Sequence, residues 1–166
     1  LPEWTQEMLH TKGLTITPKG LALLVDHIGN DLSRIANETD KLLLNLGKRK
    51  HITEEDIEEN IGVSKDYNVF ELQAALAAKD LSRSIQIIQY FEANPKAAPI
   101  QLILPSIYSF FSKVFMVFGA GSNDEKVIAA SIGVNPFFIK DYMQAARLYT
   151  YPGVEKVLLL LHQYNL

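Results

Sequence analysis

Apolar residues recur at spacings of three, four and seven along nearly the whole chain, with polar residues between them. This is the period of an amphipathic α-helix, in which one face packs against a core. No stretch alternates apolar and polar residues between turn signals, as a half-buried strand would. The pattern therefore predicts an all-α fold, with helices over 2–12, 17–28, 31–46, 53–61, 69–78, 81–93, 98–118, 123–132, 136–147 and 152–164.

The helix predicted over 31–46 is the one around which the chain is organised. Asp31 or Asn30 can cap its start, because a short side-chain oxygen accepts from the unpaired N–H groups of the first turn. Gly47 ends it, because glycine takes a left-handed conformation without strain. Its apolar side chains fall on one side. The opposite side carries polar side chains that can pair along the helix: Arg34, Glu38 and Lys41.

Turn signals divide the predicted helices into two domains. Thr53-Glu-Glu-Asp56 forms a capping box that starts a short helix ending near Gly62, and Ser122-Asn-Asp-Glu125 forms another. The polar stretch 64–68 is turn-like and is the candidate boundary. We expect a small three-helix bundle over 1–62, and a second helical domain of about five to six helices over 63–166.

Composition narrows the possible functions. Of the 166 residues, 48% are apolar and 21% charged, the balance of an ordinary globular protein. The absence of cysteine excludes disulfides and thiolate zinc sites. The net charge of −3 means that any contact with nucleic acid must be a local patch. The chain starts without methionine, and we expect it to be part of a longer protein.

One segment, 100–119, is apolar enough to be compared with a membrane span. It also contains a glutamine, a proline, three serines and Lys113, whereas a spanning helix needs about 20 mostly apolar residues. The segment is typical of a buried helix at the centre of a bundle, and we expect no membrane span.

A basic loop follows the central helix, with Lys48, Arg49 and Lys50 in sequence. These cations can contact phosphate, or they can form a solvated turn in which positive charge is favoured by the helix C-terminus. The carboxylates of 54–59 come next. Acidic residues at a helix start usually complement the helix dipole, and no histidine or cysteine stands at ligand spacing. We therefore expect no metal site.

The sequence offers no constellation for catalysis. It contains neither a phosphate-binding loop, nor a dinucleotide-binding glycine motif, nor a nucleophile elbow. The four histidines are far apart, so none of them forms a helical metal pair. We expect no catalytic residue, no metal and no cofactor in this chain.

Short signatures in a fixed order resemble the delta-subunit family of bacterial DNA polymerase III clamp loaders, and the resemblance covers essentially the whole chain. Each signature is short, and their order and spacing together make the resemblance specific. They are Pro2-Glu-Trp4, Gly13-Leu-x-Ile16, Gly29-Asn-Asp-Leu32, Asn37-Glu-x-x-Lys-Leu42, Ile52-Thr-x-Glu-Asp-Ile57, Asn68-Val-Phe-Glu-Leu72, Ile132-Gly-Val-Asn-Pro-Phe137 and Ala145-Ala-Arg147.

The resemblance implies a different role for each of the two domains. Residues 1–62 look like the lid domain that follows an AAA+ core, and residues 63–166 look like the collar domain through which loader subunits assemble. The family implies gamma/tau-type and delta-prime subunits as partners, and a sliding clamp contacted by an N-terminal domain that this chain lacks. It also implies a cytoplasmic role in DNA replication, within a holoenzyme that is a nucleotidyltransferase.

Arg34 is the candidate for a nucleotide contact. AAA+ ATPases carry a sensor arginine in a Gly-x-x-Arg-like run of the lid. Aligned on Gly29, that position falls on Leu32 or Ser33, and Arg34 lies on a different face at 100° per residue. The departure agrees with a subunit that does not hydrolyse ATP, and the other interpretation of Arg34 is a surface pair with Glu38.

Two alternatives remain open at this stage. The chain can be the lid and collar of a gamma-type or other AAA+ clamp-loader-like ATPase, which an upstream phosphate loop would reveal. It can also be an unrelated enzyme domain, an alternative supported only by the carboxylates of 54–59.

In the full loader, the resemblance implies primer-template DNA as a partner, and the candidate phosphate contacts are Lys48, Arg49, Lys50, Lys140 and Arg147. We expect weak, salt-sensitive binding at most from the chain alone.

Overall fold

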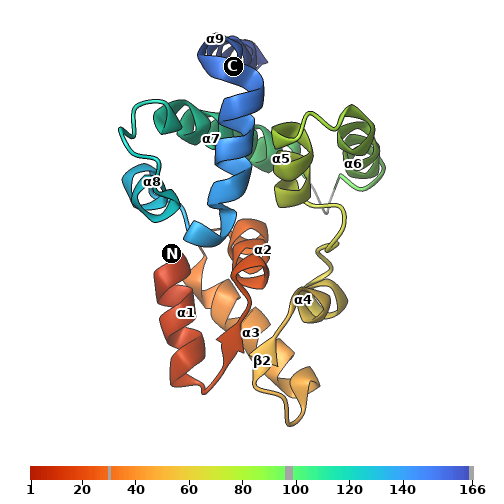
Figure 1. Cartoon of the computed structure of the whole chain (residues 1–166). Helices are drawn as coiled ribbons and strands as arrows, with labels where there is room; N and C mark the ends of the chain where they lie inside the picture. The colour runs from red at the N-terminus through yellow and green to blue at the C-terminus, as the bar shows by residue number, and fades with distance from the viewer. Residues whose placement is uncertain (30, 96–98, 165–166) are drawn as a thin grey trace. The chain divides into compact units, whose positions relative to one another are not determined.

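The computed structural model describes residues 1–29, 31–95 and 99–164, and nearly all of them are helical or in short connections (Figure 1). The all-α prediction is confirmed. The helices are α1 (Pro2–Thr11), α2 (Pro18–Ile28), α3 (Leu32–Leu46), α4 (Glu54–Ile61), α5 (Val69–Ala77), α6 (Leu81–Ala93), α7 (Ile100–Val117), α8 (Glu125–Ile132), the 3₁₀ turn η1 (Pro136–Phe138) and α9 (Ile139–Tyr164).

The chain divides into two compact units, Leu1–Asn68 and Val69–Leu166. The polar segment 64–68, which we took as the candidate boundary, forms the end of the first unit. Asn68 closes this segment, because its side-chain amide donates to the carbonyl oxygens of Ser64 and Lys65 at 2.9 and 3.0 Å. The domain boundary that we expected after residue 62 therefore lies one short turn before the boundary in the structure, which follows Asn68.

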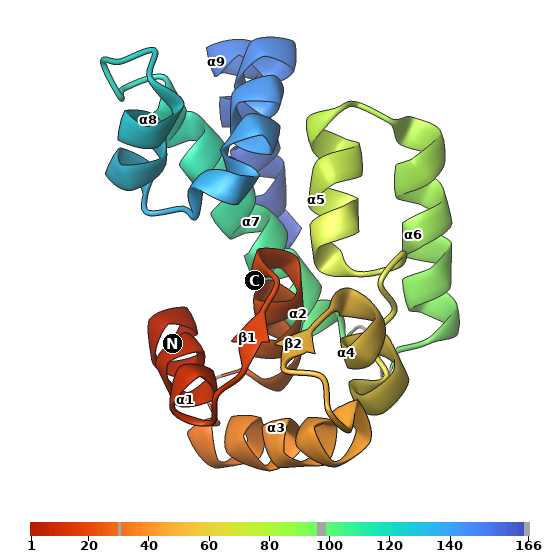
Figure 2. The ribbon, with the colours of Figure 1, turned by 60° about the horizontal axis from the view of Figure 1, so that its bottom comes forward.

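The first unit packs four helices around two very short strands. Strand β1 (Thr15–Ile16) pairs in parallel with β2 (His51–Ile52), joining segments on either side of α2 and α3 (Figure 2). We predicted only a connector at 14–16, because two residues are too few to show the alternation of a strand. The fully buried apolar side chains of this unit form its core: Leu9, Leu24, Ile35, Leu42, Ile52 and Ile57.

The helix ends confirm most of the capping predictions. Asp31 caps α3 by accepting from the Arg34 N–H at 2.9 Å, and Thr17 caps α2. The alternative cap, Asn30, lies outside the described residues. The box predicted from Ser122 is wrong, because Asp124 caps α8 and accepts from two N–H groups of its first turn. Ser122 instead accepts from the Asp124 N–H.

The second unit is organised around α7 and α9, which pack along each other, while α5 and α6 lie side by side (Figure 2). Phe110 and Phe111 of α7 are 2% exposed and lie in the core, which agrees with the buried helix predicted over 100–119. A part-buried polar contact joins α5 to α7, since the Gln73 side-chain amide donates to the Ser106 hydroxyl at 3.0 Å. A satellite core of Ile128, Ile132 and Ile139 lies where α8 meets α9.

The last helix is broken at Thr150, whose φ of 61° and ψ of 167° are not helical. We predicted two helices, 136–147 and 152–164, separated at Pro152-Gly153. In the structure the break lies just before Pro152. Proline is tolerated in the first turn of a helix, where its missing N–H would have no partner, so the non-helical residue precedes it. The first helix also begins with the 3₁₀ turn η1.

Helix α7 has the length and apolar composition of a membrane-spanning helix, and among the described residues no other helix does. Its apolar character has a role within the second unit, because one of its faces is buried against the other helices. The buried side chains of that face are Ile103, Ile107, Phe110, Phe111 and Val114. Its other faces carry Pro105, Ser109, Ser112 and Lys113 as well as exposed apolar residues.

Candidate functional site

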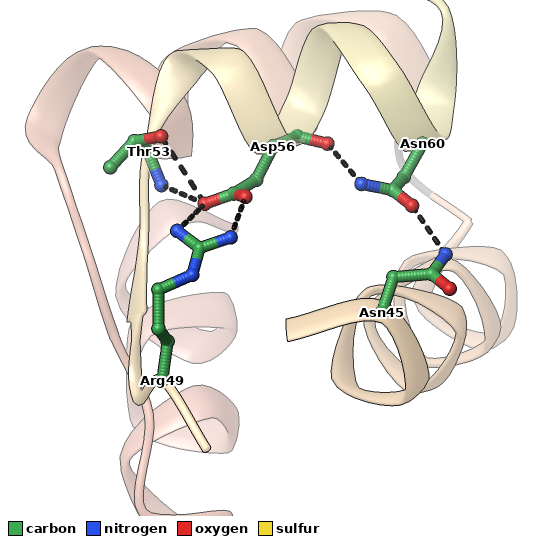
Figure 3. A network of polar contacts seen from close by, with 5 residues as sticks. All are labelled: Asn45, Arg49, Thr53, Asp56 and Asn60. Carbon is green, nitrogen blue, oxygen red and sulfur yellow. Dashed lines mark hydrogen bonds and ion pairs between the residues drawn. The ribbon is translucent and has the colours of Figure 1, made fainter. Parts of the chain in front are cut away.

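The basic loop after α3 is tied to α4 by Arg49 (Figure 3). Its guanidinium makes a two-point ion pair with Asp56, with Nη2–Oδ1 at 2.6 Å and Nη1–Oδ2 at 3.2 Å. The same carboxylate accepts from the backbone N–H of Thr53 at 2.9 Å and from its hydroxyl at 3.2 Å. Sequence predicted the capping box of Thr53 and Asp56 and missed the arginine.

The pairing of Arg49 with Asp56 favours the charged form of both side chains. Burial raises the pKa of Asp56, which is 4% exposed, but the hydrogen bonds from Arg49 and Thr53 outweigh it. The pKa of Asp56 therefore lies below its usual range, and the hydrogen bond to Asp56 raises the pKa of Arg49. A phosphate would have to compete with this carboxylate for Arg49. The side chains of Lys48 and Lys50 are exposed.

The network continues from Asp56 to the end of α3. The Asn60 side-chain amide donates to the Asp56 carbonyl oxygen at 2.8 Å, and Asn45 in turn donates to the Asn60 side-chain oxygen (Figure 3). These contacts join α3, the basic loop and α4 into one polar cluster. The cluster has a structural role, since each of its side chains makes a hydrogen bond within the first unit.

The structure brings together two of the predicted phosphate contacts in the second unit. Lys140 and Arg147 line one hollow of about 400 Å³, together with Gln144 and Leu148 of the same helix. Glu125, at the start of α8, lines the opposite side. Lys140 and Arg147 are seven residues apart, which places them two turns apart on one face of α9. Sequence named both cations and missed Gln144 and Glu125.

Arg34 lies in an open hollow of about 590 Å³ on the outer face of α3. Every residue that lines it belongs to α3 or to its cap, so a single helix face supplies the whole surface. The ion pair recorded for Glu38 is with Lys41, at 2.8 Å, where we had expected Arg34. Burial is the main cause of the lowered pKa of His27; the charge of Arg34 lowers it further, and the charge of Glu38 acts in the opposite direction.

The carboxylates of α4 face separate partners. Glu54 accepts from the Thr17 hydroxyl at 2.9 Å, and Glu55 pairs with Lys65 at 3.4 Å. Asp56 is occupied by Arg49, as described above. No group of three or more histidine or acidic side chains is placed to hold a metal ion within the described ranges.

The second unit exposes more apolar surface than sequence indicated. A groove of about 580 Å³ runs between α5, α6 and α7, walled by Leu72, Phe91, Ile103 and Ile107. Ile88 and Ile100 at its edge are 51% and 55% exposed. Helices α7 and α9 also expose apolar side chains, among them Leu102 and Leu159. The exposed stripe of α6 was missed, because an amphipathic pattern does not say which apolar face has a partner within the unit; it consists of Leu81, Ile85 and Ile88.

Comparison with known proteins agrees with the resemblance read from the sequence. No family model matches the chain. The chain is 28% identical over 151 residues to the DNA polymerase III subunit delta of Bacillus subtilis, covering 89% of this chain and 43% of that protein. The solved structure of the Bacillus subtilis DNA clamp loader delta protein matches with a TM-score of 0.60 and 25% identity, covering 99% of this chain and 48% of the other.

The chain therefore spans less than half the length of each of these relatives. The structural likeness extends over both units, and the sequence likeness over most of the chain. In sequence and in fold, the chain is similar to part of the delta subunit of the Bacillus subtilis DNA polymerase III clamp loader.

Proposed function

We propose that this chain is an assembly part of a clamp loader in bacterial DNA replication, in the position of the delta subunit. The observation that supports it is the likeness to a clamp loader delta protein over 99% of the chain, across both units. Sequence similarity over 151 residues points to the same protein class.

The two units have separate tasks in this proposal. The first unit, with its short strands and ion-paired loop, corresponds to an AAA+ lid, and the second corresponds to the collar. The exposed apolar groove beside Ile88 and Ile100 supports a partner-binding role for the second unit, because large exposed apolar patches usually mark interfaces. The partners are gamma/tau-type and delta-prime subunits, in the cytoplasm.

The remaining functions of a loader belong to parts outside this chain. A preceding domain would grip the sliding clamp. Catalysis would belong to other subunits of the holoenzyme in this proposal. Arg34, on an open face made by one helix, contacts no ATP in this proposal, and titration with a fluorescent ATP analogue is expected to give no saturable signal.

The test is assembly. The full-length protein that contains this chain is mixed with gamma-type and delta-prime subunits and run on a size-exclusion column, and co-elution is expected. Ile88→Glu places a charge at the edge of the apolar groove. It is expected to reduce the amount of this protein that co-elutes with the other subunits at least tenfold. Gln86→Glu, at an exposed position of the same helix, is the matched control and should assemble normally. Failure of the unaltered protein to enter the complex would refute the proposal.

A further inference from the structure

We propose that α9 is a two-state hinge at Thr150. In the structure the helix is bent there (Figure 1), and the other state is a straight helix that runs through Thr150 and re-aims residues 151–164. The inference concerns only the second unit and goes beyond the proposed function, on which it does not depend. It gives the strained residue of this helix a role in a change of conformation.

The bent state carries strain at Thr150. Its φ of 61° and ψ of 167° lie in a region that is populated almost only by glycine, and a β-branched side chain suits this region poorly. The nearest glycine, Gly153, stands after the break and does not relieve it. Strain of this kind persists only where the surroundings impose it, and it is typical of switch regions. The bend therefore costs free energy that a straight helix would recover.

The straight state carries a different cost, which falls on Pro152. Within a continuous helix Pro152 could not donate a hydrogen bond to the carbonyl oxygen of Leu148, and its ring would crowd that carbonyl. After the break it stands in the first turn of the second half, where a missing N–H is tolerated. The cost at Pro152 and the strain at Thr150 are of the same order. Each state thus relieves one residue and strains the other, which keeps the two states close in free energy.

Few contacts hold the second half of α9, residues 151–164, in the bent direction. Among the described residues after the break, Val154 alone is buried, with 0% exposed. Tyr151 packs against Phe115 and Phe118, with ring centroids 4.7 and 5.7 Å away, and is itself 49% exposed. Segments with few buried contacts change conformation at low cost. These contacts therefore favour the bent state without excluding the straight one.

The first half of α9 is anchored up to the residue before the break. Tyr149 donates to the Leu76 carbonyl oxygen at 2.8 Å, and its ring lies edge-on to Phe111 with centroids 5.2 Å apart. This anchorage confines the change of direction to the second half. Leu159 and Leu160 of that half are 61% and 46% exposed. The hinge therefore re-aims an exposed apolar surface while the first half stays in the core.

The experiment measures the distance across the hinge in the full-length protein that contains this chain. The chain has no cysteine, so Gln144→Cys and Gln163→Cys, at exposed positions, attach one spin label to each half of α9. Any cysteine elsewhere in the protein is replaced by serine. A straight helix separates the two positions by about 28 Å, and the bend shortens this distance. Double electron–electron resonance is expected to show a main population at the short distance and a minor one at the long distance.

Three variants move this balance in known directions. Pro152→Ala removes the cost of the straight state and is expected to raise the ratio of long to short distances by about tenfold or more. Tyr151→Ala removes the aromatic packing of the bent state and is expected to raise the ratio about fivefold. Thr150→Gly relieves the bend and is expected to leave only the short distance. Pro105→Ala, at an exposed proline inside α7, is the matched control and should leave the distances unchanged.

Thermal melting followed by circular dichroism checks that each variant is folded. A ratio in Pro152→Ala equal to that of the unaltered protein would overturn the hinge, and so would a long distance that persists in Thr150→Gly. If Pro152→Ala does not fold, Tyr151→Ala decides, and an unchanged ratio in that variant overturns the proposal. Co-elution with the other loader subunits is measured separately. It tests the proposed function alone, because the distances are recorded without those subunits.

Discussion

Arg49 and Asp56 share two hydrogen bonds, and this pair fastens the basic loop to the first turn of α4. A positively charged loop is commonly assumed to be available for a ligand. Here the middle cation already has a buried carboxylate as its partner. This ion pair sets Arg49 apart from Lys48 and Lys50, its neighbours in the basic loop.

Replacing Asp56 by alanine should lower the free energy of unfolding of the first unit by about 1–2 kcal/mol, because Thr53 and Arg49 both lose their acceptor. Chemical denaturation followed by circular dichroism checks the value. Glu59→Ala removes an exposed carboxylate from the same helix and should change stability far less. Equal losses in the two variants would contradict the role of the network.

Acid should weaken the same contact. The pKa of Asp56 is lower in the folded protein than its ordinary value of 3.8, so the folded state favours the charged carboxylate. Its contribution is present above about pH 3.8 and is lost as the pH falls through the lowered pKa. Asp56→Asn should remove this part of the acid dependence. The difference in stability between the variant and the unaltered protein should therefore be largest near pH 7 and should shrink as the pH falls below about 3.8, as denaturation curves along this pH range will show.

Asp26 should act in the opposite direction. Burial raises its pKa from 3.8 to about 6, so the folded state binds the proton more tightly and stability falls as the pH rises through this window. Asp26→Asn should stabilise the protein by about 2–3 kcal/mol at pH 7, at 1.36 kcal/mol for each pKa unit. The gain should shrink to nothing near pH 3.5, where both side chains are neutral. A gain that is independent of pH would contradict the assignment.

Thr150 carries a positive φ that is unfavourable for a β-branched residue. Thr150→Gly should raise the free energy of unfolding by about 1 kcal/mol, the relief of backbone strain less the greater freedom of glycine in the unfolded chain. Thr150→Ala keeps the strain and should not gain. Thermal melting of the two variants side by side checks the difference, and a more stable alanine variant would show that the backbone there is unstrained.

Tyr149, next to this break, joins α9 to the end of α5. Its hydroxyl donates to the Leu76 carbonyl oxygen at 2.8 Å, and its ring lies under the Lys79 ammonium and against Phe111. Tyr149→Phe should cost about 1 kcal/mol, the value of one hydrogen bond, because the ring contacts remain. Tyr164→Phe, at an exposed position of the same helix, should be neutral when both are measured by urea denaturation.

The helices of this chain could be predicted because each one carries its own signals. Pro18 after Thr17 marks the start of α2, and the apolar stripe of α3 stands between Asp31 and Gly47. Contacts between distant segments carry no such signal. The pairing of Thr15 with His51 and that of Arg49 with Asp56 depend on how the helices pack, and no local pattern specifies packing.

The residues of the candidate site also divide into those that the sequence identifies and those that only the fold brings in. Sequence identified Lys140 and Arg147 as cations, and helical spacing puts them on one face. It did not identify Glu125, which belongs to another helix and faces them only in the folded unit. It also could not separate Arg49 from its neighbours, because the three basic residues look alike until their surroundings are known.

The short pairing of β1 with β2 has a consequence for how the first unit is held together. Because Thr15 and His51 lie side by side, the segment between them leaves and rejoins the rest of the unit at one place. The pairing thus closes a loop of the chain that contains α2 and α3 and holds its two ends together. Leu24, Ile35 and Leu42 of this loop still pack with Leu9 and Ile57 outside it, so the ends and the core side chains both fix the loop in place.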